Sequence, residues 1–352
     1  MIRESIALAA LLSWLACVLL IVLGQRWGFG LDETVGELQK KHRRPTARSG
    51  GLAIVTGFAA GAVLAAAHGY STPRFDLQLA AVAAPLLLTG VWEDLRRHLS
   101  PPLRAAAGVL SALLAVMVLG AGINRLGIPG IDALLRAWPL LGTALSVVAL
   151  AAMPHAVNMI DGFHGLAGVV GAMILAAIAY VAFKVGDSRI MVLAGVGVGA
   201  LAGFLFWNWP RGDIFLGDAG AYSIGFVAAL LATLLVHDHA QVSPWFALEV
   251  LLYPSWELLF SVYRRRVLRG RPGMLADTSH LHHLVHRRLQ RALHLRAPRA
   301  REANAHTAPY LWGLAAFSIG PAVLWWDRGV WLAASCLAFV VVYVWSYRAL
   351  LH

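Results

Sequence analysis

Charged residues and cysteines are scarce in this chain. Of its 352 residues, 13% are charged and 59% are hydrophobic, a balance that excludes an ordinary soluble globular protein. The two cysteines, Cys17 and Cys336, both lie inside apolar runs, so we expect buried apolar packing for them rather than a disulfide or a zinc site. The short alternating segments of a porin-like barrel are also missing.

What the sequence contains instead is a series of apolar stretches, each about 20 residues long, which predicts an all-α integral membrane protein. Hydrocarbon offers the backbone no hydrogen-bond partners, and helices satisfy each span internally. We expect residues 1–352 to form one transmembrane domain, a polytopic bundle whose first span is retained rather than cleaved as a signal peptide. The eleven expected spans lie near 5–24, 50–68, 77–92, 103–121, 138–157, 165–183, 189–207, 219–236, 244–263, 308–325 and 330–350.

The 29 basic residues are distributed unevenly between the loops. The odd-numbered loops and the C-terminal tail carry 22 of them, whereas the even-numbered loops and the N-terminus carry 7. By the positive-inside rule the odd loops are cytoplasmic, the N-terminus is outside and the C-terminus is inside. The formal charge of +11 therefore reflects topology and attraction to anionic headgroups or substrates, not nucleic acid binding. These loops lie near 25–49, 93–102, 158–164, 208–218 and 264–307.

Asp218 lies in a turn bracketed by glycines, Gly217-Asp218-Ala219-Gly220, between two long apolar runs. Glycine lets the backbone pass close to a ligand and adopt positive φ, so such a turn can aim a carboxylate at a bound cation or phosphate. A plain interhelical loop would contain the same residue types.

Two other odd loops also carry acidic residues. Asn158 and Asp161 stand three residues apart on one helical face, before glycines that end the helix. Glu93 and Asp94 are adjacent at the inner end of the third span, where neighbouring acids repel unless they meet a cation. Metal binding or general base catalysis would account for this pair, and so would simple interfacial charge.

The remaining two odd loops are rich in cations and histidine. The segment from Lys41 to Gly51 combines basic residues, His42 and a Gly-Gly pair, and it fits a phosphate cradle or a juxtamembrane basic cluster. His280, His282 and His283 follow a run of arginines. Histidine clusters suggest zinc, but phosphate or nucleotide binding fits better beside so many arginines; a solvated loop is the remaining alternative.

Every acidic or histidine-bearing motif thus lies on an odd loop, and hence on one face of the membrane. We expect one cytoplasmic site assembled from five loops. Acids at the membrane boundary also argue against a proton or ion relay, which would place them at mid-membrane.

In order along nearly the whole chain, these motifs resemble those of the polyprenyl-phosphate N-acetylhexosamine-1-phosphate transferases, which include the MraY and WecA types. The pattern H-x-x-P-T-x-R-x-G-G appears as His42 to Gly51, and the acidic pair as Glu93-Asp94. N-x-x-D-G appears as Asn158 to Gly162, I-F-x-G-D-x-G as Ile214 to Gly220, and H-x-H-H as His280 to His283. The histidine motif is closer to the WecA branch.

The resemblance implies transfer of an N-acetylhexosamine-1-phosphate from a UDP-sugar to undecaprenyl phosphate in the bacterial inner membrane, with release of UMP. It implies Mg2+ as the cofactor, with Mn2+ as an alternative, and it leaves a homodimer open. The product would initiate a lipid-linked glycan of the cell envelope. A divalent cation suits this chemistry, because two anionic phosphates must be brought together.

The resemblance also implies functions for individual residues. Asp218 would be the principal metal ligand. Asp94 would position or deprotonate the lipid phosphate with Glu93 beside it, and Asp161 would support the metal. The residues expected to bind the substrates are His42, Thr46, Arg48, Asn158, His164, Arg271, His280, His282 and His283.

Two positions depart from the family pattern. Glu93 replaces the first aspartate of the acidic pair, which moves the carboxylate by about one methylene. His164 replaces the second acid of D-G-x-D-G and cannot serve as an anionic ligand. Two other classes of function compete with the transferase: a transporter or flippase of a lipid-linked sugar, which predicts polar residues in mid-span, and a scaffold subunit, which would not need three aspartates.

Overall fold

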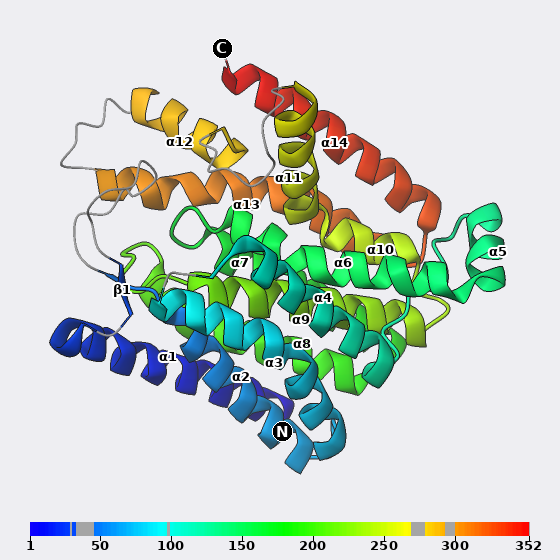
Figure 1. Ribbon diagram of the computed structural model, residues 1–352, viewed down its shortest axis with the longest axis horizontal. Helices are drawn as coiled ribbons and strands as arrows, with labels where there is room; N and C mark the ends of the chain where they lie inside the picture. Colours follow the sequence, from blue (N-terminus) through cyan, green and yellow to red (C-terminus); the bar gives the residue numbers. More distant parts are fainter. Residues whose placement is uncertain (29, 33–45, 97–98, 269–278, 293–299, 352) are drawn as a thin grey trace.

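The computed structural model describes residues 1–28, 30–32, 46–96, 99–268, 279–292 and 300–351, with only the backbone described for 300–303. The fold is a bundle of α-helices, which confirms the predicted all-α polytopic membrane protein (Figure 1). Among the described residues, ten helices are long and apolar enough to cross a membrane. They are α1 (Ile2–Trp27), α2 (Gly50–Ala67), α3 (Pro73–Arg96), α4 (Pro101–Leu119), α6 (Pro139–Ile160), α7 (Leu166–Val185), α8 (Ser188–Asn208), α9 (Gly217–Asp238), α13 (Ala300–Leu324) and α14 (Gly329–Leu351).

The expected span over 244–263 is not one continuous helix. It is divided into α10 (Pro244–Val250) and α11 (Leu252–Tyr263), followed by a short π-helix, η1 (Arg264–Leu268). Pro254 accounts for the break, since it has no N–H to donate to the carbonyl of Val250, four residues earlier, where α10 ends. Two shorter helices, α5 (Pro129–Ala137) and α12 (Leu281–Ala292), lie outside the ten spans.

Small residues allow the helices to approach one another closely. The buried face of α1 includes Ser5, Ala9 and Ser13, spaced one turn apart. A Cβ added to Gly57 of α2 would lie 2.4 Å from the carbonyl oxygen of Ala9, and one on Gly203 of α8 would lie 2.2 Å from that of Ala10. These contacts bring backbones together, which is how helices gain packing energy in lipid.

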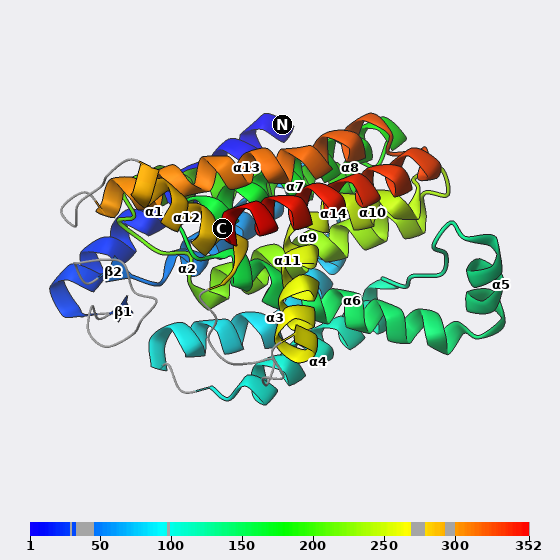
Figure 2. The ribbon, with the colours of Figure 1, turned by 90° about the horizontal axis from the view of Figure 1, so that it is seen from above.

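Helix α9 forms the centre of the bundle. It packs against α2, α3, α6 and α7, and nearly all of its residues are buried. Figures 1 and 2 show β1 (Leu31–Asp32) and α12 at one end of the bundle and α5 at the opposite end. The first turn of α9 lies at the same end as β1 and α12.

The first and fourth odd loops are joined through backbone hydrogen bonds. β1 pairs in antiparallel register with β2 (Thr46–Ala47), and Ala47 forms a parallel bridge with Ile214. The amides of Gly50 and Gly51 then donate to the carbonyls of Phe215 and Leu216 at 3.0 and 2.8 Å. These bonds hold the start of α2 against the segment that leads into α9.

Candidate active site at the first turn of α9

Asp218 lies in the first turn of α9, not in the loop before it, because the helix begins at Gly217. Gly217 has φ of +73°, and a Cβ there would lie 2.2 Å from the carbonyl oxygen of Arg48 and 2.6 Å from Oδ2 of Asp94. Only glycine accommodates both the left-handed backbone and these approaches.

Two neighbouring helices also meet this turn through glycine. A Cβ on Gly51 of α2 would lie 2.2 Å from the amide nitrogen of Gly220, and one on Gly90 of α3 would lie 2.6 Å from Cα of Ala219. Backbone from α2 and α3 is thus in direct contact with the start of α9. This packing brings Arg48 and Asp94 to Asp218.

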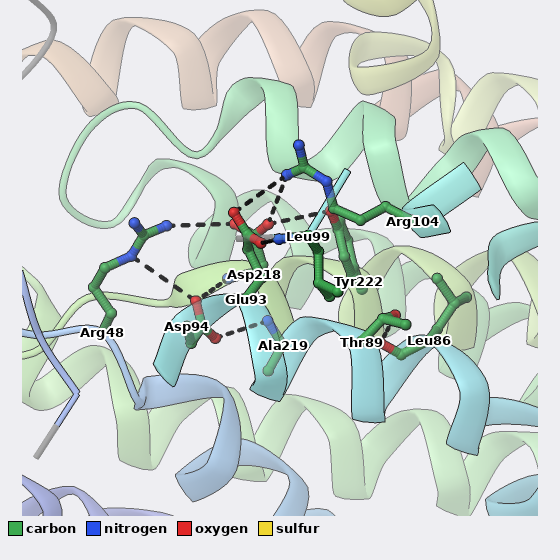
Figure 3. Close-up of polar contacts among 10 residues, drawn as sticks. All are labelled: Arg48, Leu86, Thr89, Glu93, Asp94, Leu99, Arg104, Asp218, Ala219 and Tyr222. Carbon is green, nitrogen blue, oxygen red and sulfur yellow. Dashed lines mark hydrogen bonds and ion pairs between the residues drawn. The ribbon is translucent and has the colours of Figure 1, made fainter. Parts of the chain in front are cut away.

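The carboxylate of Asp94 caps the N-terminus of α9. The amide of Asp218 donates to Oδ1 at 2.8 Å and the amide of Ala219 donates to Oδ2 at 3.0 Å (Figure 3). The first amides of a helix have no partner within the helix, and they carry the positive end of its dipole. Asp94 satisfies two of them and is itself buried, with 4% exposure. It therefore fixes the position of Asp218.

Asp218 is surrounded by donors. Nη2 of Arg48 lies 3.4 Å from Oδ1, and Nη1 of Arg104 lies 3.4 Å from Oδ2 (Figure 3). The hydroxyl of Tyr222, one turn further along α9, donates to Oδ2 at 3.2 Å. The carboxylate is thus shared by Arg48, which precedes α2, and Arg104 of α4, and Nε of Arg48 also lies 3.9 Å from Oδ1 of Asp94.

Glu93 holds the start of α4. Its Oε2 accepts a hydrogen bond from the amide of Leu99 at 3.0 Å, and Oε1 lies 3.8 Å from Nη1 of Arg104. The sequence treats Arg104 only as one basic residue of an odd loop, so its contact with Asp218 was missed. The sequence did offer a signal for this residue. Pro101-Pro102 is typical of the start of a helix, so Arg104 lies in the first turn of that helix, close to the loop before it.

Asp161 ends α6 beside this cluster. Its amide bonds back to the carbonyl of Asn158 at 3.2 Å, and the helix stops there as predicted. Burial raises the pKa of Asp161 to about 7, with Arg48 opposing the rise and the charge of Asp218 adding to it. The charges of Arg48 and Asp218 thus both influence this carboxyl group.

The histidines of the last odd loop approach the turn after Asp161. A Cβ on Gly162 would lie 2.8 Å from Nε2 of His282. The ring of Phe163 contacts those of His282, His283 and His286, with centroids 5.6, 5.7 and 4.8 Å apart. The third and fifth odd loops are therefore in contact.

His280 is held by Glu257, which the sequence placed in an expected span and gave no function. Nδ1 of His280 lies 3.1 Å from Oε1 of Glu257, and Nε2 lies 3.3 Å from Nη2 of Arg265. Oε2 of the fully buried Glu257 accepts a hydrogen bond from the hydroxyl of Tyr343 at 2.6 Å. Glu257 thus orients the first histidine of the motif.

Two other predicted substrate-binding residues lie in packed surroundings. The ring of His164 stacks near Phe215 at 5.5 Å and would meet a Cβ on Gly212, while its amide donates to Oδ1 of Asn304 at 2.9 Å. Thr46 is 6% exposed in β2. A function for either in binding stays a prediction. His42 and Arg271 lie outside the described residues.

The donor set around Asp218 fits a hard divalent cation. Across the described part of the chain, no three His, Cys, Asp or Glu side chains form a group that could hold a metal ion by themselves. Mg2+ is commonly bound by one or two carboxylates with substrate phosphates supplying further oxygens, whereas structural zinc sites use closed sets of Cys and His. Asp218, with Asp161 nearby and arginines on both sides, suits a cation that arrives together with a diphosphate.

Comparison with known proteins shows what this chain is similar to. Residues 77–236 match the family model described as glycosyl transferase family 4. The chain is 27% identical over 248 residues to a probable undecaprenyl-phosphate N-acetylglucosaminyl 1-phosphate transferase of Bacillus subtilis (strain 168), covering 70% of this chain and 67% of the relative.

Two further relatives have similar names. A decaprenyl-phosphate N-acetylglucosaminephosphotransferase of Mycobacterium leprae (strain TN) is 29% identical over 307 residues, covering 78% of this chain and 74% of the relative. An undecaprenyl-phosphate alpha-N-acetylglucosaminyl 1-phosphate transferase of Escherichia coli (strain K12) is 28% identical over 261 residues, covering 71% and 67%.

Proposed function

Because the chain belongs to glycosyl transferase family 4, with the polyprenyl-phosphate N-acetylhexosamine-1-phosphate transferases, we propose that it transfers an N-acetylhexosamine-1-phosphate from a UDP-sugar to undecaprenyl phosphate. The product would be a lipid-linked sugar that initiates a cell-envelope glycan, and UMP would leave. The observation that carries the proposal is the cluster of Arg48, Arg104 and Asp218 on a helix end capped by Asp94.

In this reaction an oxygen of the acceptor phosphate attacks the β-phosphorus of the UDP-sugar, and the bond from that phosphorus to the bridging oxygen of UMP breaks. Both substrates are anions, so the site must neutralise charge that concentrates at the β-phosphate. Arg48 and Arg104 face each other across Asp218 and supply that charge. We assign them to the diphosphate and to the acceptor phosphate.

The acceptor needs little help from a base. A phosphate monoester has a second pKa near 6, so it carries about −1.5 to −2 charge at neutral pH and is already nucleophilic. Both oxygens of Asp94 accept backbone hydrogen bonds. Of the two functions that the resemblance offers for Asp94, we therefore propose positioning, and we assign Glu93 to positioning Arg104.

Asp218 and Asp161 are the residues that would hold Mg2+, with Mn2+ as a substitute. A bound divalent cation would neutralise the diphosphate and polarise the β-phosphorus. His280, His282 and His283, with His42 and Arg271, are proposed to bind the UDP end of the donor. We further propose a location in the bacterial inner membrane with these loops in the cytoplasm, as the basic residues predict.

The rival transporter would use ionisable groups within the spans. Glu249 and Glu257 do lie within the expected span over 244–263. Glu257 is bound by Tyr343 and His280. Glu249 accepts from Ser335 Oγ at 2.7 Å and Cys336 Sγ at 3.0 Å, so Cys336 is a donor to a buried acid rather than only apolar packing. Such satisfied pairs hold helices together instead of lining a pathway.

The decisive experiment uses purified protein in lipid nanodiscs with undecaprenyl phosphate and a panel of UDP-sugars, and follows UMP release with Mg2+ and with EDTA. We expect metal-dependent UMP release with at least one N-acetylhexosamine donor. A transporter or scaffold would release no UMP from any donor, and that result would refute the proposal.

A further inference from the structure

A histidine lies inside the membrane directly below the candidate active site. His155 belongs to α6 and stands one turn before Asn158. It is five residues from the end of the helix at Ile160, which places it about 8 Å into the span. Ionisable side chains within a span are uncommon and usually serve a function, because hydrocarbon solvates them poorly. The motifs in the sequence did not include this residue.

Two helices, α9 and α4, meet its ring. The ring of Tyr222 from α9 meets it edge to face, with centroids 5.4 Å apart and an interplanar angle of 74°. On α4, Gly108 offers no side chain, so that a Cβ there would lie 3.7 Å from Nε2 of His155. Arg104 stands one turn before Gly108 on the same face of α4, and the charges of Arg104 and Asp218 both reach the ring.

Nε2 of His155 is buried and has no hydrogen-bond partner anywhere in the described part of the chain. Leaving a buried polar atom unpaired costs about 1–3 kcal/mol, so a ring kept only for packing would be more stable as phenylalanine. The adjacent Tyr222 does not relieve this, because its hydroxyl donates to Asp218. A polar ligand atom at Nε2 would.

The shape of the acceptor in the proposed reaction determines on which side of Asp218 its phosphate must bind. Its phosphate must reach the β-phosphate held at Asp218, while its hydrocarbon chain stays in the bilayer. Groups that bind this phosphate must therefore lie on the membrane side of Asp218. Tyr222 follows Asp218 by four residues in α9, which places it about 6 Å deeper, and His155 lies beside it.

On the basis of the proposed function, we propose that Nε2 of His155 binds the phosphate of the polyprenyl acceptor, together with the guanidinium of Arg104. Arg104 supplies the charge and His155 supplies a neutral donor that fixes the orientation of the phosphate. A divalent cation is the wrong ligand for this position, because the positive charge of Arg104 reaches the same ring.

The test compares His155→Phe with His155→Gln. Phenylalanine keeps the ring contact with Tyr222 and removes the polar nitrogen, whereas glutamine keeps an N–H at a similar distance from the backbone. We expect His155→Phe to raise the KM for undecaprenyl phosphate about tenfold or more, as the loss of one hydrogen bond to a charged group does. The KM for the UDP-sugar should change by less than about twofold, and His155→Gln should keep most of the acceptor affinity.

A second readout does not depend on turnover. Heptaprenyl phosphate is titrated into nanodiscs without donor or metal, and binding is followed by tryptophan fluorescence. We expect His155→Phe to weaken this binding by about the same factor as it raises the KM. The matched control is His237→Phe, at the opposite end of α9, where Nδ1 of His237 lies 2.9 Å from the carbonyl oxygen of Gly122; it should bind like the unaltered protein.

Three results separate the explanations. Unchanged acceptor KM and unchanged binding in folded His155→Phe overturn the proposal while the transferase function stands. A fall in kcat alone also overturns it, since His155 would then act through Tyr222. If the unaltered protein binds heptaprenyl phosphate through His155 but releases UMP from no UDP-sugar, the acceptor site stands and the proposed function fails.

Discussion

Arginines from other segments lie at both ends of α9, but they have different partners there. At the C-terminal end, Nη2 of Arg125 donates to the carbonyls of Val236, His239 and Val242 at 2.9, 3.0 and 2.8 Å. At the N-terminal end, Arg48 and Arg104 share the carboxylate of Asp218 at 3.4 Å each.

The difference lies in the partners of each charge. A guanidinium at a helix C-terminus neutralises the negative end of the dipole and closes orphan carbonyls, so Arg125 stabilises the fold. Arg48 and Arg104 instead meet carboxylates: both lie 3.4 Å from Asp218, Arg48 also lies 3.9 Å from Asp94, and Arg104 lies 3.8 Å from Glu93. Such a cluster of both signs suits a cation bound together with an anionic ligand. Structural and functional arginines can thus be told apart by what surrounds them, and the following variants test that distinction.

The largest effect is expected from Asp218→Asn. The change keeps the shape of the side chain and removes the charge that would bind the cation, so UMP release should fall by about 10³-fold or more. Mn2+ should no longer raise the Tm of the variant, whereas it should raise that of the unaltered protein. Near-normal turnover in a folded Asp218→Asn protein would refute the assigned metal function.

A pair of variants, Arg104→Met and Arg125→Met, tests whether the arginines at the two ends of α9 differ in function. We expect Arg104→Met to lower kcat/KM about 10²-fold, with little change in Tm, because it removes charge stabilisation at the reacting phosphates. Arg125→Met should lose about 1.5–3 kcal/mol of stability and keep kcat/KM within about threefold.

Thermal unfolding and UMP release, measured on both purified variants, check this pair. If both arginine variants lose stability and activity in parallel, the distinction between the two ends of α9 is wrong.

Asp94→Asn should have a smaller effect, on both stability and kcat. The amide group can accept from only one of the two helix amides and turns an NH2 toward the other, so the cap weakens by about 1 kcal/mol. Asp218 then moves slightly, and kcat should fall about tenfold while both KM values stay close to normal. A drop in activity without any drop in Tm would show that Asp94 acts chemically, as a base, and not as a cap.

The last prediction concerns the stability of the metal-free protein, in Asp161→Asn. Burial raises the pKa of Asp161 to about 7, above the ordinary value of about 3.9. Ionising it in the folded protein is therefore unfavourable, and stability falls as the pH rises from about 4 to about 7.

The asparagine variant lacks this cost. In EDTA, its Tm should exceed that of the unaltered protein at pH 8 by several degrees, and the gap should narrow toward pH 5. A gap that does not change with pH would contradict the buried-carboxylate explanation.

Much of the architecture follows from local features of the chain. Ten of the eleven spans predicted from the length and apolarity of each run lie close to observed helices, because a helix in hydrocarbon must satisfy its own backbone over a fixed thickness. The break at Leu251 was missed although Pro254 was visible, since a proline within a span is often tolerated. The glycines around Asp218 mark a close approach of protein segments, with Arg48 and Asp94 against Gly217 and Gly51 of α2 against Gly220; the predicted approach to a ligand stays a prediction.

Sequence alone determined that this is a polytopic helical membrane protein, and it predicted that the acidic and histidine motifs gather on one face of the membrane. Only the tertiary structure decided which residues meet. Asp94 and Asp218 are both aspartates beside glycines or apolar residues, yet one caps the helix and the other faces two arginines. Arg104 joined the site, and His155 came to lie beneath it, for the same reason: their partners come from helices distant in sequence, and contacts of that kind depend on how the spans pack, which no local pattern encodes.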